Sequence, residues 1–579
     1  MAELVPALRK RTLLARLSFE VNWAQIGLLL LLAGFGFYVL YPLLLILINS
    51  FDTARIGQQP VYGVESWLDA WRSPGIWAAL WNSIVVAFWY QLISFPLGAL
   101  IAWLLARTNF PWARGVEFLF WLSFFLPALS FTLGWMLLLD PKVGVINQLL
   151  AQLFHLDQGP FNIFSLPGIV WVHVMSHAVS TKVMLLTPAF RNMDVALEEA
   201  GGMSGANTWT TFRRVTLPLM TPALIIVFLL GIVRLFENFE IELLLGVPFG
   251  FYVFSTKVLD LVRQDPPLVS QASALGSVTL LLLVLAVPLQ RWLTTRRQYV
   301  TVSSRMKPGL IDLGVWRWPV FGCVLLLGAT LVAVPVLSSL AASLMTRFGF
   351  FEIPRPWTLR HWQLVLSDSG FLRALLNTAV IAILSGVVSA VLFSLVAYVI
   401  VRGKRLRGAT TLDALMWVPS VIPGTLAGLG LLWMFLGTPL FNPLYGTVFL
   451  LIIAIMLGGV TLSTQLFKAG LLNLSREFEE ASRMSGASAV RTYFRVVLPL
   501  LGPVLIVVAT LRFLFAANET ASIILLSTSE TRTISLLTID YVFQGLREPA
   551  AVTSVIVAAL TTAAALMARR FGFRGIAAA

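Results

Sequence analysis

Long uncharged apolar stretches recur along this chain, and they limit its fold more than any other feature. Four of them are 22 to 29 residues long: Ile26–Ile48, Phe118–Leu139, Trp318–Thr346 and Ala374–Val401. The hydrocarbon core of a bilayer needs about 20 apolar residues per helix. Charged residues make up only 12% of the 579 residues, whereas ordinary globular domains carry about 25%. We therefore expect an all-α polytopic membrane protein and exclude a soluble enzyme.

The apolar segments predict twelve membrane spans. The uncharged run from Ala414 to Phe467 is too long for one span, and the Gly437-Thr438-Pro439 and Asn442-Pro443 sequences divide it into two helices. The fifth and eleventh spans are the least regular, because they contain Arg and Glu residues. The expected spans lie near 25–49, 76–105, 116–139, 166–190, 216–244, 268–290, 318–345, 374–401, 412–436, 444–467, 497–526 and 550–568.

The basic residues orient these spans. With the N-terminus inside, the loops on that side collect 27 of the 41 Lys and Arg residues. Cytoplasmic loops of membrane proteins carry such an excess, so both termini are expected in the cytoplasm. The net charge of +14 follows from this distribution and does not indicate a nucleic-acid partner. The lipid bilayer is the partner of the apolar surface.

An internal duplication divides the chain into two halves. The segment 198–219 recurs as 479–500 at a constant spacing of 281 residues, and a weaker echo relates 81–85 to 376–380. Both copies follow the fourth span of their half, so we expect two parallel six-helix repeats with the pathway between them. The predicted divisions are a cytoplasmic segment 1–24, a first six-helix domain 25–292, a cytoplasmic linker 293–317, a second six-helix domain 318–570 and a cytoplasmic tail 571–579.

Each copy of the duplicated segment reads as a short helix, a turn and the start of a membrane helix. Acidic residues favour the helix N-terminus, glycine breaks the helix, and Leu-Pro suits the first turn of the next one. A protruding helix that is present twice fits two equivalent grooves of a dimeric partner, and a plain connector is the alternative. The pattern consists of Glu198, Glu199, Ala200, Gly205, Leu217 and Pro218, repeated as Glu479, Glu480, Ala481, Gly486, Leu498 and Pro499.

These two segments resemble the cytoplasmic loop motif of permease subunits of binding-protein-dependent ABC importers. That motif reads Glu-Ala-Ala, three residues, Gly, nine residues, Ile-x-Leu-Pro. The chain departs from it mildly: Gly201 and Ser482 replace the third residue, and Val215 and Val496 replace Ile. The resemblance covers both halves and is closest to the fused two-permease subunits of ferric iron importers, whose relatives carry thiamine, polyamines or phosphonates.

The resemblance implies a non-catalytic permease of a bacterial inner membrane. The chain lacks a Gly-x-x-x-x-Gly-Lys-Ser/Thr phosphate-binding loop, because Gly403-Lys404 has neither the upstream glycine nor the following hydroxyl. ATP and magnesium are therefore expected in a separate ATPase, with two copies docked on the two loops and no cofactor in this chain. A periplasmic solute-binding protein would deliver the solute, with ferric iron the best guess.

Ionisable residues inside spans are costly and deserve a functional hypothesis. Glu237 and Glu240 are three residues apart, which would place them on adjoining parts of one helix face, where they could line a cation-accepting vestibule. The alternative is a structural Arg234–Glu237 pair with the other carboxylates at the water interface. The full set of candidate pathway residues is Arg234, Glu237, Glu240, Arg512, Asn518 and Glu519.

Other polar residues carry structural interpretations. His173 and His177 share a helix face and could hold a metal, but Lys182 follows them and favours packing or helix–helix hydrogen bonding. Asp140 and Asp157 are expected to be solvated in an outer loop, and no metal site is predicted. An ion-coupled 6+6 secondary transporter remains the rival class, although it does not explain why the most similar segments are cytoplasmic loops.

Overall fold

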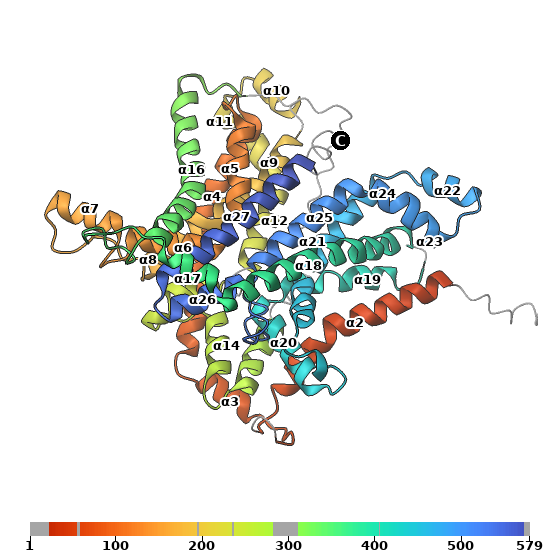
Figure 1. Cartoon of the computed structure of the whole chain (residues 1–579). Coiled ribbons are helices and arrows are strands. Elements are labelled where there is room, and N and C mark those ends of the chain that lie inside the picture. Colours follow the sequence, from red (N-terminus) through yellow and green to blue (C-terminus); the bar gives the residue numbers. More distant parts are fainter. Residues whose placement is uncertain are drawn as a thin grey trace, which may run out of the picture.

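The computed structural model describes residues 23–54, 58–193, 196–233, 237–281, 311–403 and 406–571 (Figure 1). Over these ranges the backbone forms helices joined by turns, with isolated bridges and no strand. Eight helices are long and apolar enough to cross a membrane, or up to twelve if each strongly bent pair is one span. The predicted all-α membrane fold with two repeats is therefore confirmed.

The first half begins with a long helix, and its last described element is an unlabelled apolar helix, Val269–Leu281. Its elements are α2 (Trp23–Asn49), α3 (Glu65–Arg72), α4 (Ile76–Arg107), α5 (Ala113–Phe125), α6 (Ala128–Leu139), α7 (Val145–Phe154), α8 (Leu166–His173), η1 (Val174–Ala178), α9 (Val179–Arg191), α10 (Ala196–Met203), α11 (Thr208–Thr211), η2 (Phe212–Thr216), α12 (Leu217–Val233), α13 (Glu240–Leu245), η4 (Val247–Phe249) and α14 (Phe254–Arg263).

The second half repeats this order. Its elements are η5 (Gly314–Trp316), α16 (Arg317–Leu344), α17 (Arg360–Ser367), α18 (Ser369–Arg402), α19 (Ala409–Leu415), η6 (Val418–Val421), α20 (Gly424–Gly437), η7 (Asn442–Leu444), α21 (Val448–Leu472), α22 (Glu477–Met484), α23 (Ala489–Thr492), η8 (Tyr493–Val497), α24 (Leu498–Leu500), α25 (Gly502–Asn518), α26 (Ile534–Phe543) and α27 (Arg547–Phe571).

The weak sequence echo near residues 82 and 377 marks an equivalent contact in both halves. Asn82 donates its amide to the Tyr252 carbonyl at 2.9 Å, and Asn377 donates to the Arg532 carbonyl at 3.0 Å. The next residue in each half, Ser83 or Thr378, accepts the backbone N–H that opens α14 or α26, at 2.8 and 2.9 Å. The residues of the weak echo therefore anchor equivalent short helices, α14 in the first half and α26 in the second.

The first helix of each half packs against the other half. α2 lies along α19 and α20, whereas α16 lies along α5 and α6, as the red and green ribbons show in Figure 1. The buried clusters follow this exchange: Leu28, Phe35 and Ile46 of α2 join the core of the second half, and Val324 and Leu331 of α16 join that of the first. The exchange ties the two halves together.

Two predicted spans are broken in the middle. The third, expected at 116–139, bends by 97° between α5 and α6, and the ninth, expected at 412–436, bends by 111° before α20. Each later helix begins directly after a proline, Pro127 or Pro423. Proline lacks the N–H and excludes a helical conformation for the residue before it, which explains both breaks.

The fifth and eleventh helices end earlier than predicted. α12 stops at Val233 instead of 244, and α25 stops at Asn518 instead of 526. The chain then forms α14 and α26, which the sequence did not predict. Hydroxyl groups on these helices satisfy carbonyls near the broken ends: Ser255 donates to Asn238, and Ser535 donates to Ala517 at 3.0 Å. Backbone groups at membrane depth need such internal partners.

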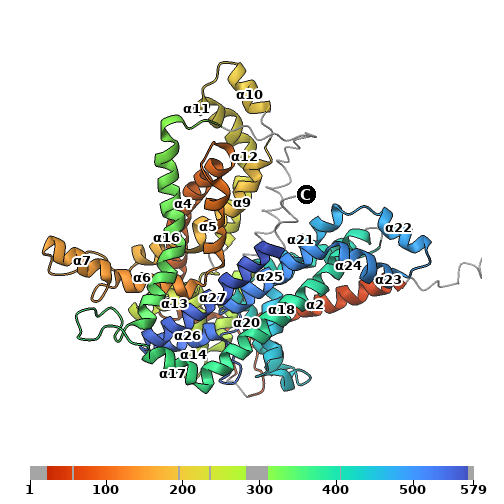
Figure 2. The ribbon, with the colours of Figure 1, turned by 45° about the horizontal axis from the view of Figure 1, so that its top comes forward.

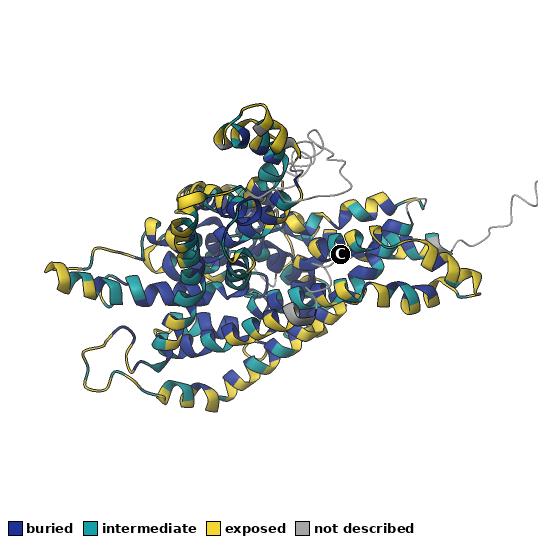
Figure 3. Cartoon of the chain, turned by 90° about the horizontal axis from the view of Figure 1, so that it is seen from above, coloured by how far each residue is buried: buried dark blue, intermediate teal, exposed yellow. Residues whose placement is uncertain are grey.

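The two duplicated loops lie at the tips of two diverging arms. Figure 2 shows α10 and α11 at the end of one arm and α22 and α23 at the end of the other, while α14, α17 and α26 lie where the arms join. We call the tips the loop end and the junction the far end. Leu30, Leu326 and Leu376 are large apolar side chains that are exposed, and Figure 3 shows exposed residues along the outer helices, which suits a lipid surrounding.

Candidate functional site: two duplicated loops and a closed far end

Each duplicated loop folds as a helix, a glycine turn and a second helix. α10 ends at Met203, Gly205 adopts φ +81°, and α11 follows. In the second loop Gly486 adopts φ +82° between α22 and α23. A left-handed backbone costs a residue with a side chain about 1–2 kcal/mol, so glycine relieves strain at both positions. The predicted break at these two glycines is present.

Pro218 and Pro499 do not begin their helices, contrary to the sequence expectation. The helical path starts at Thr208 or Ala489, and one π-helical turn, η2 or η8, precedes each Leu-Pro pair. Proline removes an N–H and collides with the carbonyl four residues earlier. The wider π turn accommodates both effects, so the helical path includes the proline in both halves, and in the second half it then bends by 77° between Leu500 and Gly502.

The first carboxylate of the first loop is bound inside the protein. Glu198 forms an ion pair with Arg107, the last residue of α4, and its other oxygen accepts the Thr216 hydroxyl at 2.6 Å. The Arg107 side chain is fully buried and also donates to the Met193 carbonyl at 3.3 Å. Glu198 therefore clamps α10 to the second span of its half.

The second half contains the same clamp. Arg402, the last residue of α18, contacts Glu479 with Nε–Oε1 at 2.7 Å, and Tyr398 donates its hydroxyl to Oε2 at 3.0 Å. Arg402 also donates to the Leu474 carbonyl at 3.0 Å. The sequence alone marked none of Arg107, Tyr398 and Arg402 as part of a clamp. The available signal was a basic residue ending the second span of both halves.

The second carboxylate of each pair faces solvent. Glu199 and Glu480 are exposed, as are Ala200 and Ala481. Met203 and Met484, which are equivalent by the repeat, are each 89% exposed. Gly205, Gly486, Leu217, Pro218 and Pro499 are also exposed, whereas Leu498 is half-buried. The duplicated loops thus divide their Glu pairs between an inward clamp and an outward surface.

The candidate pathway residues gather at the far end, where the halves meet. The Thr520 hydroxyl donates to Glu240 Oε1 across the two halves. Glu519 accepts the Ser522 backbone N–H and hydroxyl, both at 2.9 Å. Asn518 donates to the Phe125 carbonyl at 3.3 Å. Three of the six predicted residues are therefore held close to this junction.

The remaining pathway residues are placed differently from the prediction. Glu237 lies in a turn and Glu240 opens α13, so they do not share a helix face. This is because α12 has already ended. Arg512 is buried against Gly459 and donates to the Ile455 carbonyl at 2.5 Å, so it binds within the second half. Arg234 lies outside the described residues, so its pairing with Glu237 stays a prediction.

His173 takes part in a buried helix–helix contact. Its Nε2 lies 2.7 Å from Glu242 Oε1, and its ring stacks on Tyr90 with centroids 5.0 Å apart. Lys182 donates to Ser94 at 2.9 Å. His177 packs against Phe131, with ring centroids 5.5 Å apart. This matches the packing interpretation of the histidines.

Asp140 is not solvated, contrary to the expectation, whereas Asp157 is exposed. The Asp140 carboxylate accepts the N–H groups of Lys142 and Val143 at 2.9 and 3.2 Å, and its other oxygen lies 3.1 Å from Arg547. The sequence separates Asp140 and Arg547 by 407 residues, so no local pattern could indicate this pair.

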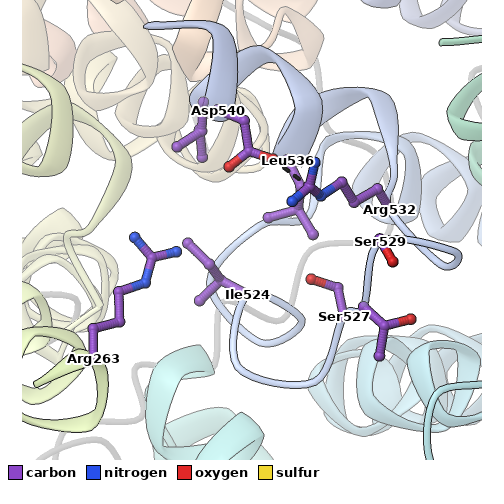
Figure 4. Close-up of a pocket in the computed structure, with 9 residues that line it drawn as sticks. Arg263, Ile524, Ser527, Ser529, Arg532, Leu536 and Asp540 are labelled. Atoms are coloured by element: carbon purple, nitrogen blue, oxygen red, sulfur yellow. Dashed lines mark ion pairs between the residues drawn. The ribbon is translucent and has the colours of Figure 1, made fainter. Parts of the chain in front are cut away.

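A small pocket of about 140 Å³ opens at the far end between the halves. Figure 4 shows Arg263 of α14 and Arg532 on opposite sides of it, with Ile524 between them and Ser527 nearby. Arg532 pairs with Asp540 at 3.1 Å, whereas no described carboxylate lies within ion-pair distance of Arg263. The rim is therefore basic, with two arginines against the one carboxylate of Asp540.

Known proteins match this chain along most of its length. The family described as "Binding-protein-dependent transport system inner membrane component" matches residues 390–574. The ferric transport system permease protein FbpB of Actinobacillus pleuropneumoniae is 25% identical, over 88% of this chain and 72% of the relative.

Two further relatives each match about one third of the chain. The inner membrane ABC transporter permease protein YcjO of Escherichia coli K12 is 30% identical, over 34% of this chain and 68% of the relative. The molybdenum transport system permease protein ModB of Haemophilus influenzae is 29% identical, over 37% and 92%. The chain therefore belongs to the binding-protein-dependent transport system inner membrane components and is a permease subunit of an ABC importer.

Proposed function

We propose that this single chain forms the whole translocation pathway of an ATP-driven importer. Two copies of a separate ATPase, which bind ATP and magnesium, dock on the two duplicated loops. The loop end, with both termini, faces the cytoplasm, and a periplasmic solute-binding protein delivers solute at the far end. The observation that carries this proposal is the equivalent presentation of a short helix with an exposed Glu, Glu199 or Glu480, at both arm tips.

The loop surface has the chemistry of a docking site. Met203 and Met484 are nearly fully exposed at the tips, where Trp209 and Val490 are exposed as well, and methionine adapts its shape to apolar grooves. Glu199 and Glu480 add one negative charge beside each methionine, which fits a basic groove rim. The clamps at Glu198 and Glu479 hold α10 and α22 against the second spans, so movement of the partner is transmitted to the membrane helices.

Ferric iron is the best-supported cargo. The ferric-type relative aligns with both halves, whereas the molybdenum-type relative aligns with little more than one third of the chain. Carboxylates at the junction, Glu240 and Glu519, offer hard oxygen ligands, which suit a hard cation. Thiamine, polyamine or phosphonate cargo are the alternatives, and the basic rim at Arg263 and Arg532 is the observation that favours an anion such as phosphonate.

Affinity purification from the native membrane tests the assignment. The chain alone is expected to show no ATPase activity, and an ATPase and a binding protein are expected to co-purify with it. Glu480→Lys should reduce ATPase recovery at least tenfold, whereas Glu352→Lys, an exposed Glu in an outer loop, should not. Solute uptake that persists without an ATPase and collapses with an ionophore would instead establish the secondary transporter.

A further inference from the structure

Two residues at equivalent positions in the repeat bind each other. Thr520 and Glu240, which share a hydrogen bond, are 280 residues apart. The same spacing relates the first residues of α14 and α26, Phe254 and Ile534. Two copies related by a two-fold axis bring equivalent residues together only next to that axis. Glu240 and Thr520 therefore lie at the pseudo-two-fold axis of the permease.

An apolar cluster from both halves surrounds this contact. Phe239, Leu243 and Leu259 of the first half are buried against Ile539 of the second, and Ile524 and Leu525 pack on the cluster. Thr520 is fully buried. The arms diverge toward the loop end (Figure 2), so the halves are joined at the far end in this conformation.

Glu240 is the carboxylate at this junction that is bound across the two halves. Glu519 is occupied within its own half by two hydrogen bonds from Ser522, and Glu242 is directed to His173. Separation of the halves at the far end would break the Thr520–Glu240 hydrogen bond and leave Glu240 exposed beside the axis. The Ser522 and His173 contacts would remain.

We propose that the Thr520–Glu240 hydrogen bond is a latch that keeps the far end closed, with Thr520 the positioning residue for the Glu240 carboxylate. This rests on the proposed function, in which the far end opens to receive solute. A hydrogen bond to a charged group contributes on the order of 10- to 100-fold to an equilibrium. Loss of the latch should shift the ratio of closed to open far ends by that factor.

Labelling of a cysteine in the apolar cluster around the Thr520–Glu240 contact measures this equilibrium directly. The single native thiol is removed by Cys323→Ser, and Ala521→Cys, partly buried in the apolar cluster, becomes the reporter in the full chain in lipid nanodiscs. A membrane-impermeant maleimide is the probe. Thr520→Val, which removes the donor but keeps the shape, should raise the labelling rate at least tenfold. Thr520→Ser, which keeps the hydroxyl, should stay within threefold of the parent.

The control is Thr510→Val on α25, ten residues before Thr520, because Thr510 is half-buried and donates within its own helix to the Ile506 carbonyl. It should leave the rate unchanged. Exchanging the pair, Glu240→Thr with Thr520→Glu, rebuilds the same donor and acceptor across the axis and should restore slow labelling that Thr520→Glu alone loses. Thermal unfolding of each variant is recorded, so that labelling rates are compared only among variants that are folded.

A Thr520→Val rate within twofold of the parent would overturn the latch, as would an exchanged pair that labels as fast as Thr520→Glu. These outcomes are independent of any ATPase. A chain that gains labelling but recruits no ATPase would leave the latch in place and refute the proposed function. A chain that recruits an ATPase but labels at the same rate in all variants would support the proposed function and refute the latch.

Discussion

Substitution of Glu479 by Gln should loosen the second duplicated loop, whereas the same change at the adjacent Glu480 should not. Glu479 is buried and receives hydrogen bonds from Arg402 Nε at 2.7 Å and the Tyr398 hydroxyl at 3.0 Å. Glu480 is exposed. Gln keeps the size of the side chain but removes the charge that pairs with Arg402.

The size of the effect follows from these contacts. A hydrogen bond to a charged group contributes about 1.5–3 kcal/mol to stability. The Gln amide retains one acceptor oxygen, so the loss should lie near the lower part of that range, about 1.5–2 kcal/mol. Since every 1.4 kcal/mol is roughly tenfold in an equilibrium, local opening of α22 should become about 10- to 30-fold more frequent.

Hydrogen exchange read by mass spectrometry reports this opening. Amides of residues 477–497 should exchange about 10- to 30-fold faster in Glu479→Gln, and less than twofold faster in Glu480→Gln. Glu198→Gln should act in the same way on α10, because Glu198 binds Arg107 and Thr216. Equal exchange in Glu479→Gln and the parent would refute the clamp, and an equal rise in Glu480→Gln would show that any charge loss loosens the loop.

Three further outcomes are expected. Gly486→Val, at a φ of +82°, should cost the loop turn about 1–2 kcal/mol and lower ATPase recovery in co-purification, whereas Gly502→Val, where a Cβ would meet open space, should not. Arg547→Gln should lower thermal stability by about 1–3 kcal/mol, because it leaves the buried Asp140 without its cation; adding Asp140→Asn should recover part of that loss, and a purely additive double variant would contradict the pair. Glu242→Gln should destabilise α8 and α9 in hydrogen exchange by weakening the 2.7 Å contact with His173, and unchanged exchange there would show that the contact contributes nothing.

The features that could be predicted from the sequence are those that depend on apolar composition and on the internal repeat. The apolar runs gave the long spans, and the repeated segments located both loops and their glycine turns at Gly205 and Gly486. The breaks within the third and ninth spans were harder to predict, because Pro127 and Pro423 each lie inside a continuous uncharged apolar run. Apolar character alone does not distinguish a straight span from two helices at 97° or 111°.

Contacts between distant residues could not be predicted from one sequence. Arg107 and Glu198 are 91 residues apart, and Arg402 and Glu479 are 77 apart. Their pairing requires the second span and the loop to lie side by side, which is a property of the packed fold. The short helices α14 and α26 were missed for a related reason: each has about ten residues, so it is stabilised by the Ser83 and Thr378 hydroxyls and by packing more than by local preference.

The duplication allows one half to serve as an internal comparison for the other. Both halves contain the clamp, at Glu198 or Glu479, and the anchor, at Asn82 or Asn377. Under the proposed function two identical ATPase subunits bind the two loops, so these supporting contacts are expected to be the same in both halves. At the axis the halves differ, with Glu240 facing Thr520. A symmetric pair of carboxylates would repel across the closed junction, whereas one carboxylate and one hydroxyl form a hydrogen bond. This difference is possible because the two halves belong to one chain and can differ in sequence, whereas two copies of one subunit cannot.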